Sequence, residues 1–464
     1  MTGKKHKNLT DYEICRGQGV THSFMRAMKR RENILPKTIL EGHLNGILNK
    51  REALLESASL FGTPQYFFDE PSLSQSIAQF NAACSGFLTR YRLFYAMKSN
   101  CFSGICGRVV AEGMGLDVSS GFELSMALST DCKQIIFSGP GKTDAELSLA
   151  VQNRQRVTLL MDSFGELDRL SRILKRKKDM RGSLRAGIRI QNNHQGTWDK
   201  FGIPLNDLSN LMKKALSTAG VALCGIQFHT SWNLDPSQQV KMINEIGSYL
   251  KQSLPKDLRK SLTFLDIGGG YWPEQGEWLN PQNTLKGKLL QLLETEVGST
   301  PRHYYRKAST LEHFAREIGR AFSHRGFPLS DFEIWMEPGR WISSPSMHVL
   351  LSVIDKKNSR TVITDGGTNL LGWERPLSEF IPVVNLSRPA LREQSLRVFG
   401  SLCTPDDVWG TSVFGDGIVP GDVLVIPHQG AYTYSLRQSF IKPRSKVIRY
   451  NGKSLEKVEE EESF

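Results

Sequence analysis

The stretch LFYAMKSN, residues 93–100, is a short apolar run that ends in polar residues, and seven similar runs follow it. Continuous apolar runs are typical of parallel strands that are buried on both faces, and segments with helical periodicity separate them here. Eight strand–helix units over about 250 residues predict an α/β fold, the (β/α)8 TIM barrel. The other runs are MGLDVSSG (114–121), QIIFSGPGK (134–142), VTLLMDS (157–163), LRAGIRI (184–190), VALCGIQFH (221–229), LTFLDIGGG (262–270) and FEIWMEPGR (332–340).

The pattern divides the chain into three parts. Residues 1–60 are polar and net basic and are expected to form an N-terminal extension that packs partly on a second domain. Residues 61–340 are assigned to the barrel. After Arg340, short strand-like runs separated by turn residues predict a C-terminal all-β domain, a sandwich or barrel, over residues 341–464.

Two further segments stand out. The interval from Asp266 to Glu337 is long for a barrel loop, so it is expected to contain an insertion after the seventh strand, with helices at 285–298 and 311–322. The C-terminal KVEEEESF (457–464) is a run of like charges, and such runs are usually solvated. It is expected to be a frayed tail.

Composition excludes several classes of protein. The 464 residues carry 59 Lys+Arg and 47 Asp+Glu, a net charge of +12, with 39% apolar residues. No apolar stretch reaches the ~18 residues of a membrane span, and no apolar segment of a secretory signal follows the basic N-terminus. Seven cysteines without a CxxC pair indicate neither a disulfide scaffold nor a metal site. The basic cluster at 169–178 has the pattern of a solvated helix face. We therefore expect a cytoplasmic protein that binds neither nucleic acid nor membrane.

Polar residues end each predicted strand, which is where barrel enzymes carry their catalytic groups. A desolvated lysine such as Lys98 can attack an aldehyde, although a single lysine is more often salt-bridged. Gly268-Gly269-Gly270 can turn backbone N–H groups toward an anion, and Arg340 can add a charge-assisted bond to it. Glu337 could keep a pyridine nitrogen protonated, and His229 offers a flat ring. A lone glycine run is more often a turn, and a lone histidine more often a core residue.

Together these residues resemble the fold-type III pyridoxal-phosphate decarboxylases of ornithine, lysine, arginine and diaminopimelate, which have an alanine-racemase-like barrel. The resemblance implies an amino-acid decarboxylase with pyridoxal 5'-phosphate as cofactor, working as a homodimer with shared active sites. The matching strings run in family order from residue 62 to about residue 445, and include GTPQYFFD (62–69), FYAMKSN (94–100), GLDVSSGFE (115–123), FSGPGK (137–142), QFH (227–229), DIGGGY (266–271), EPGR (337–340), GGTN (366–369), LCTPDD (402–407) and GAY (430–432).

The resemblance also implies the roles of individual residues. The expected cofactor-binding set is Lys98 as the Schiff-base lysine, Asp117 as its electrostatic neighbour with Glu123 nearby, Arg189 near the phenolic oxygen, His229 stacked on the ring, Glu337 at the pyridine nitrogen, Gly268, Gly269, Gly270 and Arg340 around the phosphate, and Tyr432 closing the site. Cys403 matches the cysteine that the second subunit donates to reprotonate the product. The expected substrate contacts are Arg340, Arg375, Glu379, Thr404, Asp407 and Tyr432.

Three departures from the family pattern concern the phosphate and the substrate. The usual HVGS is replaced by His229-Thr230-Ser231-Trp232, so Ser231 or Thr230 is expected to bind the phosphate. Thr404 stands where an acidic residue usually reads the substrate's distal amine, which leaves Asp406 or Glu379 as the nearest acids. Arg375 is followed by Glu379 where the diaminopimelate branch has a tyrosine. These changes predict a longer or modified amino acid with a polar far end, not simply L-ornithine or L-lysine.

Two other functions remain open. A racemase on the same fold is disfavoured, because family racemases place an arginine at the pyridine nitrogen and this chain has Glu337. A non-catalytic, cofactor-binding regulator is disfavoured because such relatives typically lose the lysine or the glycine run, and both are present.

Overall fold

The structure, a computed structural model, describes residues 33–176, 182–192, 198–280, 303–323, 328–372 and 379–463. Eight parallel strands close into a barrel in the order β12-β3-β4-β5-β6-β7-β8-β9. All eight apolar runs form these strands, so the predicted barrel is confirmed. The strands are β3 (Tyr91–Ala96), β4 (Gly115–Val118), β5 (Ile135–Phe137), β6 (Val157–Met161), β7 (Leu184–Arg189), β8 (Val221–Gln227), β9 (Phe264–Asp266) and β12 (Glu333–Met336).

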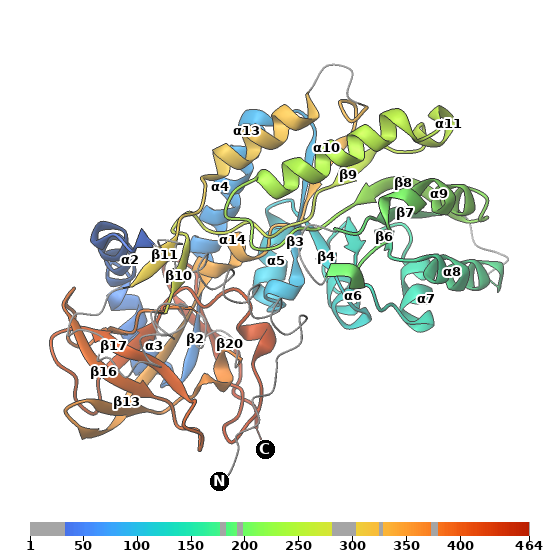
Figure 1. Cartoon of the computed structure of the whole chain (residues 1–464). Coiled ribbons are helices and arrows are strands. Elements are labelled where there is room, and N and C mark those ends of the chain that lie inside the picture. The colour runs from blue at the N-terminus through green and yellow to red at the C-terminus, as the bar shows by residue number, and fades with distance from the viewer. Residues whose placement is uncertain are drawn as a thin grey trace, which may run out of the picture.

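Helices surround the barrel, on the right in Figure 1. The predicted basic helix is α8, in which Leu167, Leu170 and Leu174 are buried while Arg172 and Lys175 are exposed, as expected of a solvated charged face. The helices are α4 (Glu70–Phe87), α5 (Ser103–Ala111), α6 (Gly121–Leu128), α7 (Asp144–Gln152), α8 (Phe164–Arg176), α9 (Leu208–Leu216), α10 (Ser237–Gln252), α11 (Lys256–Arg259) and α13 (Leu311–Phe322).

Aromatic side chains fill the barrel interior. The rings of Phe264 and Trp335 stack with centroids 3.5 Å apart, and Phe94 packs against Trp335. The neighbouring strand supplies Gly225 at this level, where a Cβ atom would overlap the Phe264 ring. The interior is therefore a packed core, and the chemistry is confined to the ends of the strands.

A nine-stranded sheet forms the second domain, at the lower left of Figure 1, with the order β14-β16-β17-β15-β18-β13-β2-β19-β20. Two helices that precede the barrel, α2 (Lys37–Leu48) and α3 (Arg51–Phe61), pack on this sheet. Its strands are β2 (Gln65–Asp69), β13 (Met347–Asn358), β14 (Thr361–Thr364), β15 (Val384–Asn385), β16 (Glu393–Phe399), β17 (Val408–Phe414), β18 (Val423–Ile426), β19 (Val447–Tyr450) and β20 (Leu455–Glu459).

The domain boundary expected at residue 61 is wrong for β2. This strand pairs antiparallel with β13 and parallel with β19, so it belongs to the second domain and the barrel begins at β3. The sequence was misleading because QYFFD is buried along its whole length, as a strand of the barrel would be. A continuous apolar run does not reveal its pairing partners.

The insertion and the tail are both structured where they are described. The insertion contributes β10 (Glu277–Leu279), β11 (Tyr304–Arg306) and the predicted helix α13, while the helix expected at 285–298 lies outside the described residues. The tail is not frayed, because β20 pairs with β19 and its acids meet basic partners. Glu459 lies 2.8 Å from Arg437, and Glu462 lies 3.0 Å from Arg444. Within the described ranges, every helix is too short or too polar to cross a lipid bilayer.

Candidate active site

Lys98 lies between two carboxylates at the mouth of the barrel. It follows β3 in a short 3-10 helix, Met97–Ser99. Its Nζ atom donates to Asp117 Oδ2 at 2.8 Å and lies 3.8 Å from Glu337 Oε2. Desolvation disfavours the ammonium, but the two carboxylates outweigh it and raise the pKa of Lys98. Since 32% of its side chain is exposed, the amine can be reached from the mouth.

Asp117 is held from its other side by the end of the next strand. Ser138 Oγ donates to Asp117 Oδ1 at 2.5 Å, and the Ser138 carbonyl accepts from Arg189 Nη1 at 3.1 Å. The Arg189 guanidinium also lies over the ring of Phe201. Burial and the nearby Glu337 raise the pKa of Asp117. Glu123 lies in the first turn of α6, where its carboxylate accepts from the Ser119 N–H at 2.7 Å.

Glu337 and His229 form a second buried pair. His229 Nδ1 lies 3.3 Å from Glu337 Oε2, and Gln227 Nε2 donates to Glu337 Oε1 at 3.2 Å. Although burial favours the neutral acid, His229 and Lys98 lower the pKa of Glu337 to about 2. Burial also lowers the pKa of His229. The pair is therefore an anionic carboxylate beside a neutral imidazole.

The glycine run fits tightly between β8 and β12. Gly268 and Gly270 have φ angles of +67° and +83°, a region that side chains rarely adopt. A Cβ atom on Gly269 would overlap the Glu337 carbonyl, and one on Gly270 would overlap the Thr230 carbonyl. Such close packing brings bare backbone to the strand ends, where the Gly268 and Gly269 N–H groups donate to Asp266 Oδ1 and His229 Nδ1 at 2.9 and 3.3 Å.

The two residues whose hydroxyls are expected at the phosphate, Thr230 and Ser231, differ in their exposure. Thr230 is fully buried and its Oγ1 accepts from Asn233 Nδ2 at 2.8 Å. Ser231 is only partly buried, and its Cα lies 3.0 Å from the point where a Cβ of Gly270 would stand. Ser231 is thus the more exposed of the two residues, and its exposure favours it over Thr230 as the phosphate contact.

Arg340 joins the barrel to the second domain. It begins the short helix α14 (Arg340–Ser343). Its guanidinium lies 4.2 Å from the ring centre of Trp272, 4.9 Å from that of Tyr432 and 3.5 Å from Glu379 Oε1. The Tyr432 N–H donates to the Ser99 carbonyl at 2.7 Å, next to Lys98. Two predicted residues of the second domain, Tyr432 and Glu379, thus lie at the barrel mouth.

Asp266 is a site residue to which the sequence analysis assigned no role. It ends β9, is fully buried, and accepts from the Gly268 N–H at 2.9 Å through Oδ1. Burial and the nearby Glu337 raise its pKa well above the ordinary value, which favours its protonated form beside Glu337. Its position at the end of a strand, just before the glycine run, could have identified it as a site residue from the sequence.

The predicted substrate loop of the second domain has a different organisation from the one expected. Cys403 is exposed, as a donated residue must be. Asp407, by contrast, is buried, and its carboxylate accepts from Thr368 N (2.7 Å), Thr368 Oγ1 (2.9 Å) and Leu402 N (2.7 Å). These bonds within its own domain engage both oxygens of Asp407 and favour a structural role over the expected substrate contact. Arg375 lies outside the described residues.

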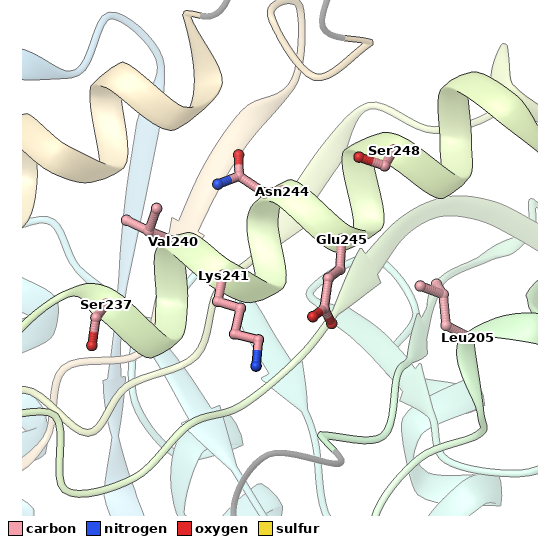
Figure 2. A pocket seen from close by; sticks show the side chains of 7 residues that line it. All are labelled: Leu205, Ser237, Val240, Lys241, Asn244, Glu245 and Ser248. Carbon is pink, nitrogen blue, oxygen red and sulfur yellow. The ribbon is translucent and has the colours of Figure 1, made fainter.

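The structure has one groove apart from the site and one hollow that adjoins it. The first is an open groove along α10, lined by Ser237, Val240, Lys241, Asn244, Glu245 and Ser248 of this helix and by Leu205 (Figure 2). It is on the helical layer and does not reach the strand ends. The second lies between the two domains and touches the site, because Arg340 and Glu379 form one of its walls and His43 and Trp278 another.

Comparison with known proteins gives consistent matches. Residues 73–344, more than half of the chain, match the family described as pyridoxal-dependent decarboxylase, pyridoxal binding domain. A diaminopimelate decarboxylase of Methanothermobacter thermautotrophicus is 26% identical over 450 residues, 91% of this chain and 94% of that protein. A 2-[(L-alanin-3-ylcarbamoyl)methyl]-2-hydroxybutanedioate decarboxylase of Staphylococcus aureus is 27% identical over 362 residues, 74% of this chain and 84% of that protein.

Solved structures show the same fold. Diaminopimelate decarboxylase from Helicobacter pylori, in complex with L-lysine, superposes with a TM-score of 0.71 at 22% identity, covering 88% of this chain and 96% of that one. Lysine/ornithine decarboxylase from Vibrio vulnificus, in complex with putrescine, gives a TM-score of 0.65 at 19% identity, covering 87% and 98%.

Proposed function

Because the chain belongs to the pyridoxal-dependent decarboxylase family, and is thus an amino-acid decarboxylase that uses pyridoxal 5'-phosphate, we propose that Lys98 holds the cofactor and that the substrate has a polar far end other than a simple ammonium. The contacts of Asp407 carry the second part. They leave no buried carboxylate available in the described Cys403 loop to pair with a substrate ammonium.

The residues present suit the cofactor. The amine of Lys98 faces the barrel mouth, and the glycine run with Arg340 and Ser231 offers a place for a phosphate. Glu337 is anionic, and an anion is what holds a proton on a pyridine nitrogen. An arginine in that position would not do so, which supports the decarboxylase over the racemase alternative. Lys98 and the glycines are all present, which disfavours a non-catalytic regulator.

Each residue then has a defined task in the reaction. Bound pyridoxal phosphate supplies an electron sink for the electron pair that remains when CO2 leaves. Lys98 must lose a proton before its amine can bond to an aldehyde, and Asp117 is the nearest acceptor of that proton. His229, being neutral, can lie against a cationic ring without repelling it. Glu337 keeps the proton on the ring nitrogen, and Cys403 returns a proton to the α-carbon.

The side chains of the Cys403 loop restrict which chemical group the far end of the substrate can carry. A buried ammonium needs a carboxylate partner, since an unpaired charge costs several kcal/mol. Thr404 is not acidic, Asp406 is exposed, and Asp407 is occupied. The carboxylate of Glu379 already faces the guanidinium of Arg340. A hydroxyl or amide at the far end of the substrate avoids this cost, and a carboxylate avoids it only where a cation such as Arg375 pairs with it.

The Staphylococcus aureus relative gives this substrate class a concrete form. By its name, that enzyme acts on an alanine unit joined through an amide to a hydroxybutanedioate, so the far end carries carboxylates and a hydroxyl. We expect an amino acid of the same kind here. We also expect a homodimer in which Cys403 enters the partner's site, since it is exposed on the second domain.

The test is CO2 release from a panel of substrates. The panel contains L-ornithine, L-lysine, meso-diaminopimelate and the amide-linked hydroxybutanedioate amino acid. We expect the highest kcat/KM for the last compound, and efficient turnover of L-ornithine or L-lysine would contradict the substrate proposal. Borohydride reduction followed by peptide mapping should place the cofactor on Lys98. Lys98→Ala should lose the label, whereas Lys213→Ala, an exposed lysine on α9, should keep it.

A further inference from the structure

A buried ion pair next to the active site has no part in the reaction described above. Lys142 follows β5 and Glu166 lies on α8, with 0% and 1% of their side chains exposed. Lys142 Nζ donates to the Gly139 carbonyl (2.5 Å), the Leu160 carbonyl (2.9 Å) and Glu166 Oε1 (3.0 Å). These three acceptors match the three hydrogens of an ammonium. Buried ion pairs are costly to desolvate, so this pair calls for an explanation beyond stability.

Lys142 hydrogen-bonds to Gly139, and the residue before it, Ser138, hydrogen-bonds to Asp117. Gly139 packs so closely on β4 that a Cβ atom would overlap the Ser119 carbonyl. Ser138, one residue earlier, donates its N–H to the Val118 carbonyl at 2.9 Å and its hydroxyl to Asp117 Oδ1 at 2.5 Å. A displacement of Gly139 would therefore move the Ser138 hydroxyl away from Asp117.

We propose that Ser138 is a positioning residue, which holds Asp117 so that its other oxygen meets Lys98, and that the buried Lys142–Glu166 pair fixes Ser138 in place. The inference rests on the proposed role of Lys98. A carboxylate with one oxygen bound by a hydroxyl has a defined orientation and is stabilised as an anion. Without that bond, Asp117 is a weaker partner for the Lys98 ammonium, and the amine loses its proton at lower pH.

The first test measures the amine directly in full-length enzyme freed of cofactor by dialysis against hydroxylamine. Acetic anhydride labelling as a function of pH, read by mass spectrometry on the Lys98 peptide, reports the fraction of neutral amine. Ser138→Ala should increase labelling of Lys98 at pH 8 about tenfold, equivalent to one pH unit. Ser138→Thr keeps the hydroxyl and should label like wild type. Unchanged labelling in Ser138→Ala overturns the proposal.

A matched control separates this effect from the loss of any buried hydroxyl. Ser57 is buried in α3, which packs on the sheet of the second domain, and its hydroxyl donates to Gln65 Oε1 at 2.6 Å. Ser57→Ala should leave the labelling of Lys98 unchanged. If Ser57→Ala changes it as much as Ser138→Ala does, the effect is a general loss of stability and the proposal fails.

The second test separates positioning from folding for the ion pair. Lys142→Met alone leaves Glu166 unpaired, so the double variant Lys142→Met/Glu166→Leu is measured beside it. We expect the double variant to regain the thermal stability that the single variant loses, while labelling of Lys98 remains raised because Gly139 has lost its donor. If a stable double variant labels like wild type, the Lys142–Glu166 pair does not position Ser138 and that part of the proposal is wrong. Borohydride mapping reports separately whether Lys98 holds the cofactor, so the two proposals can fail independently.

Discussion

Asp407→Asn distinguishes a structural carboxylate from a substrate-binding one. Asp407 Oδ1 accepts two hydrogen bonds from Thr368 and Oδ2 accepts one from the Leu402 N–H. Asparagine has one acceptor oxygen, so its best orientation keeps the Thr368 bonds and turns an N–H toward Leu402. One charge-assisted bond is lost, at about 1.5–3 kcal/mol, and a buried donor faces another donor, at about 1–3 kcal/mol.

We therefore expect Asp407→Asn to lower the free energy of unfolding by roughly 2.5–6 kcal/mol, out of the ~5–15 kcal/mol typical of folded domains. Urea unfolding of the cofactor-loaded enzyme measures it. The control is Asp406→Asn, an exposed neighbour, which should stay within about 0.5 kcal/mol of wild type. The structural reasoning is refuted if Asp407→Asn is as stable as the control and instead raises KM.

Three more predictions concern the site. The pKa of Asp266 is raised in the fold, so the native state loses stability as pH rises above the unfolded-state pKa of ~3.9. Asp266→Asn has no ionisable group here and does not lose this stability. The difference in Tm between Asp266→Asn and wild type, measured without cofactor, should therefore grow in favour of the variant from pH 4 to pH 8. A difference that stays constant over this range would contradict the prediction. An equal mixture of Lys98→Ala and Cys403→Ala chains should regain about a quarter of wild-type activity, since half of randomly paired dimers are mixed and each has one intact site. No recovery despite proven subunit exchange would exclude a shared site. Thr404→Glu should raise kcat/KM for meso-diaminopimelate and L-lysine at least ~10-fold, worth ~1.4 kcal/mol, and an unchanged preference would remove Thr404 from the substrate pocket.

The sequence by itself determined the barrel and the chemistry of its rim. Apolar runs separated by helical periods are local patterns, and eight of them sufficed to locate every barrel strand. In a parallel barrel all strands end at the same rim, so the sequence placed Lys98, Asp117 and Glu337 at that rim. They contact one another because β12, β3 and β4 are neighbours in the barrel. The chemistry of Lys98, Glu337 and the glycine run could be inferred from these rim positions, whereas the full set of cofactor-binding roles came from the family resemblance and remains a prediction.

Tertiary structure alone decided which partners each group has. The strand β2 has a barrel-like sequence but pairs in the second domain, and the acidic tail is ordered by Arg437 and Arg444. Asp407 lies in a motif associated with substrate, yet backbone groups brought in from Thr368 and Leu402 occupy it. A sequence states how many hydrogen bonds a side chain can make. Only the fold determines which of them are already made, because those partners come from segments far apart in the chain.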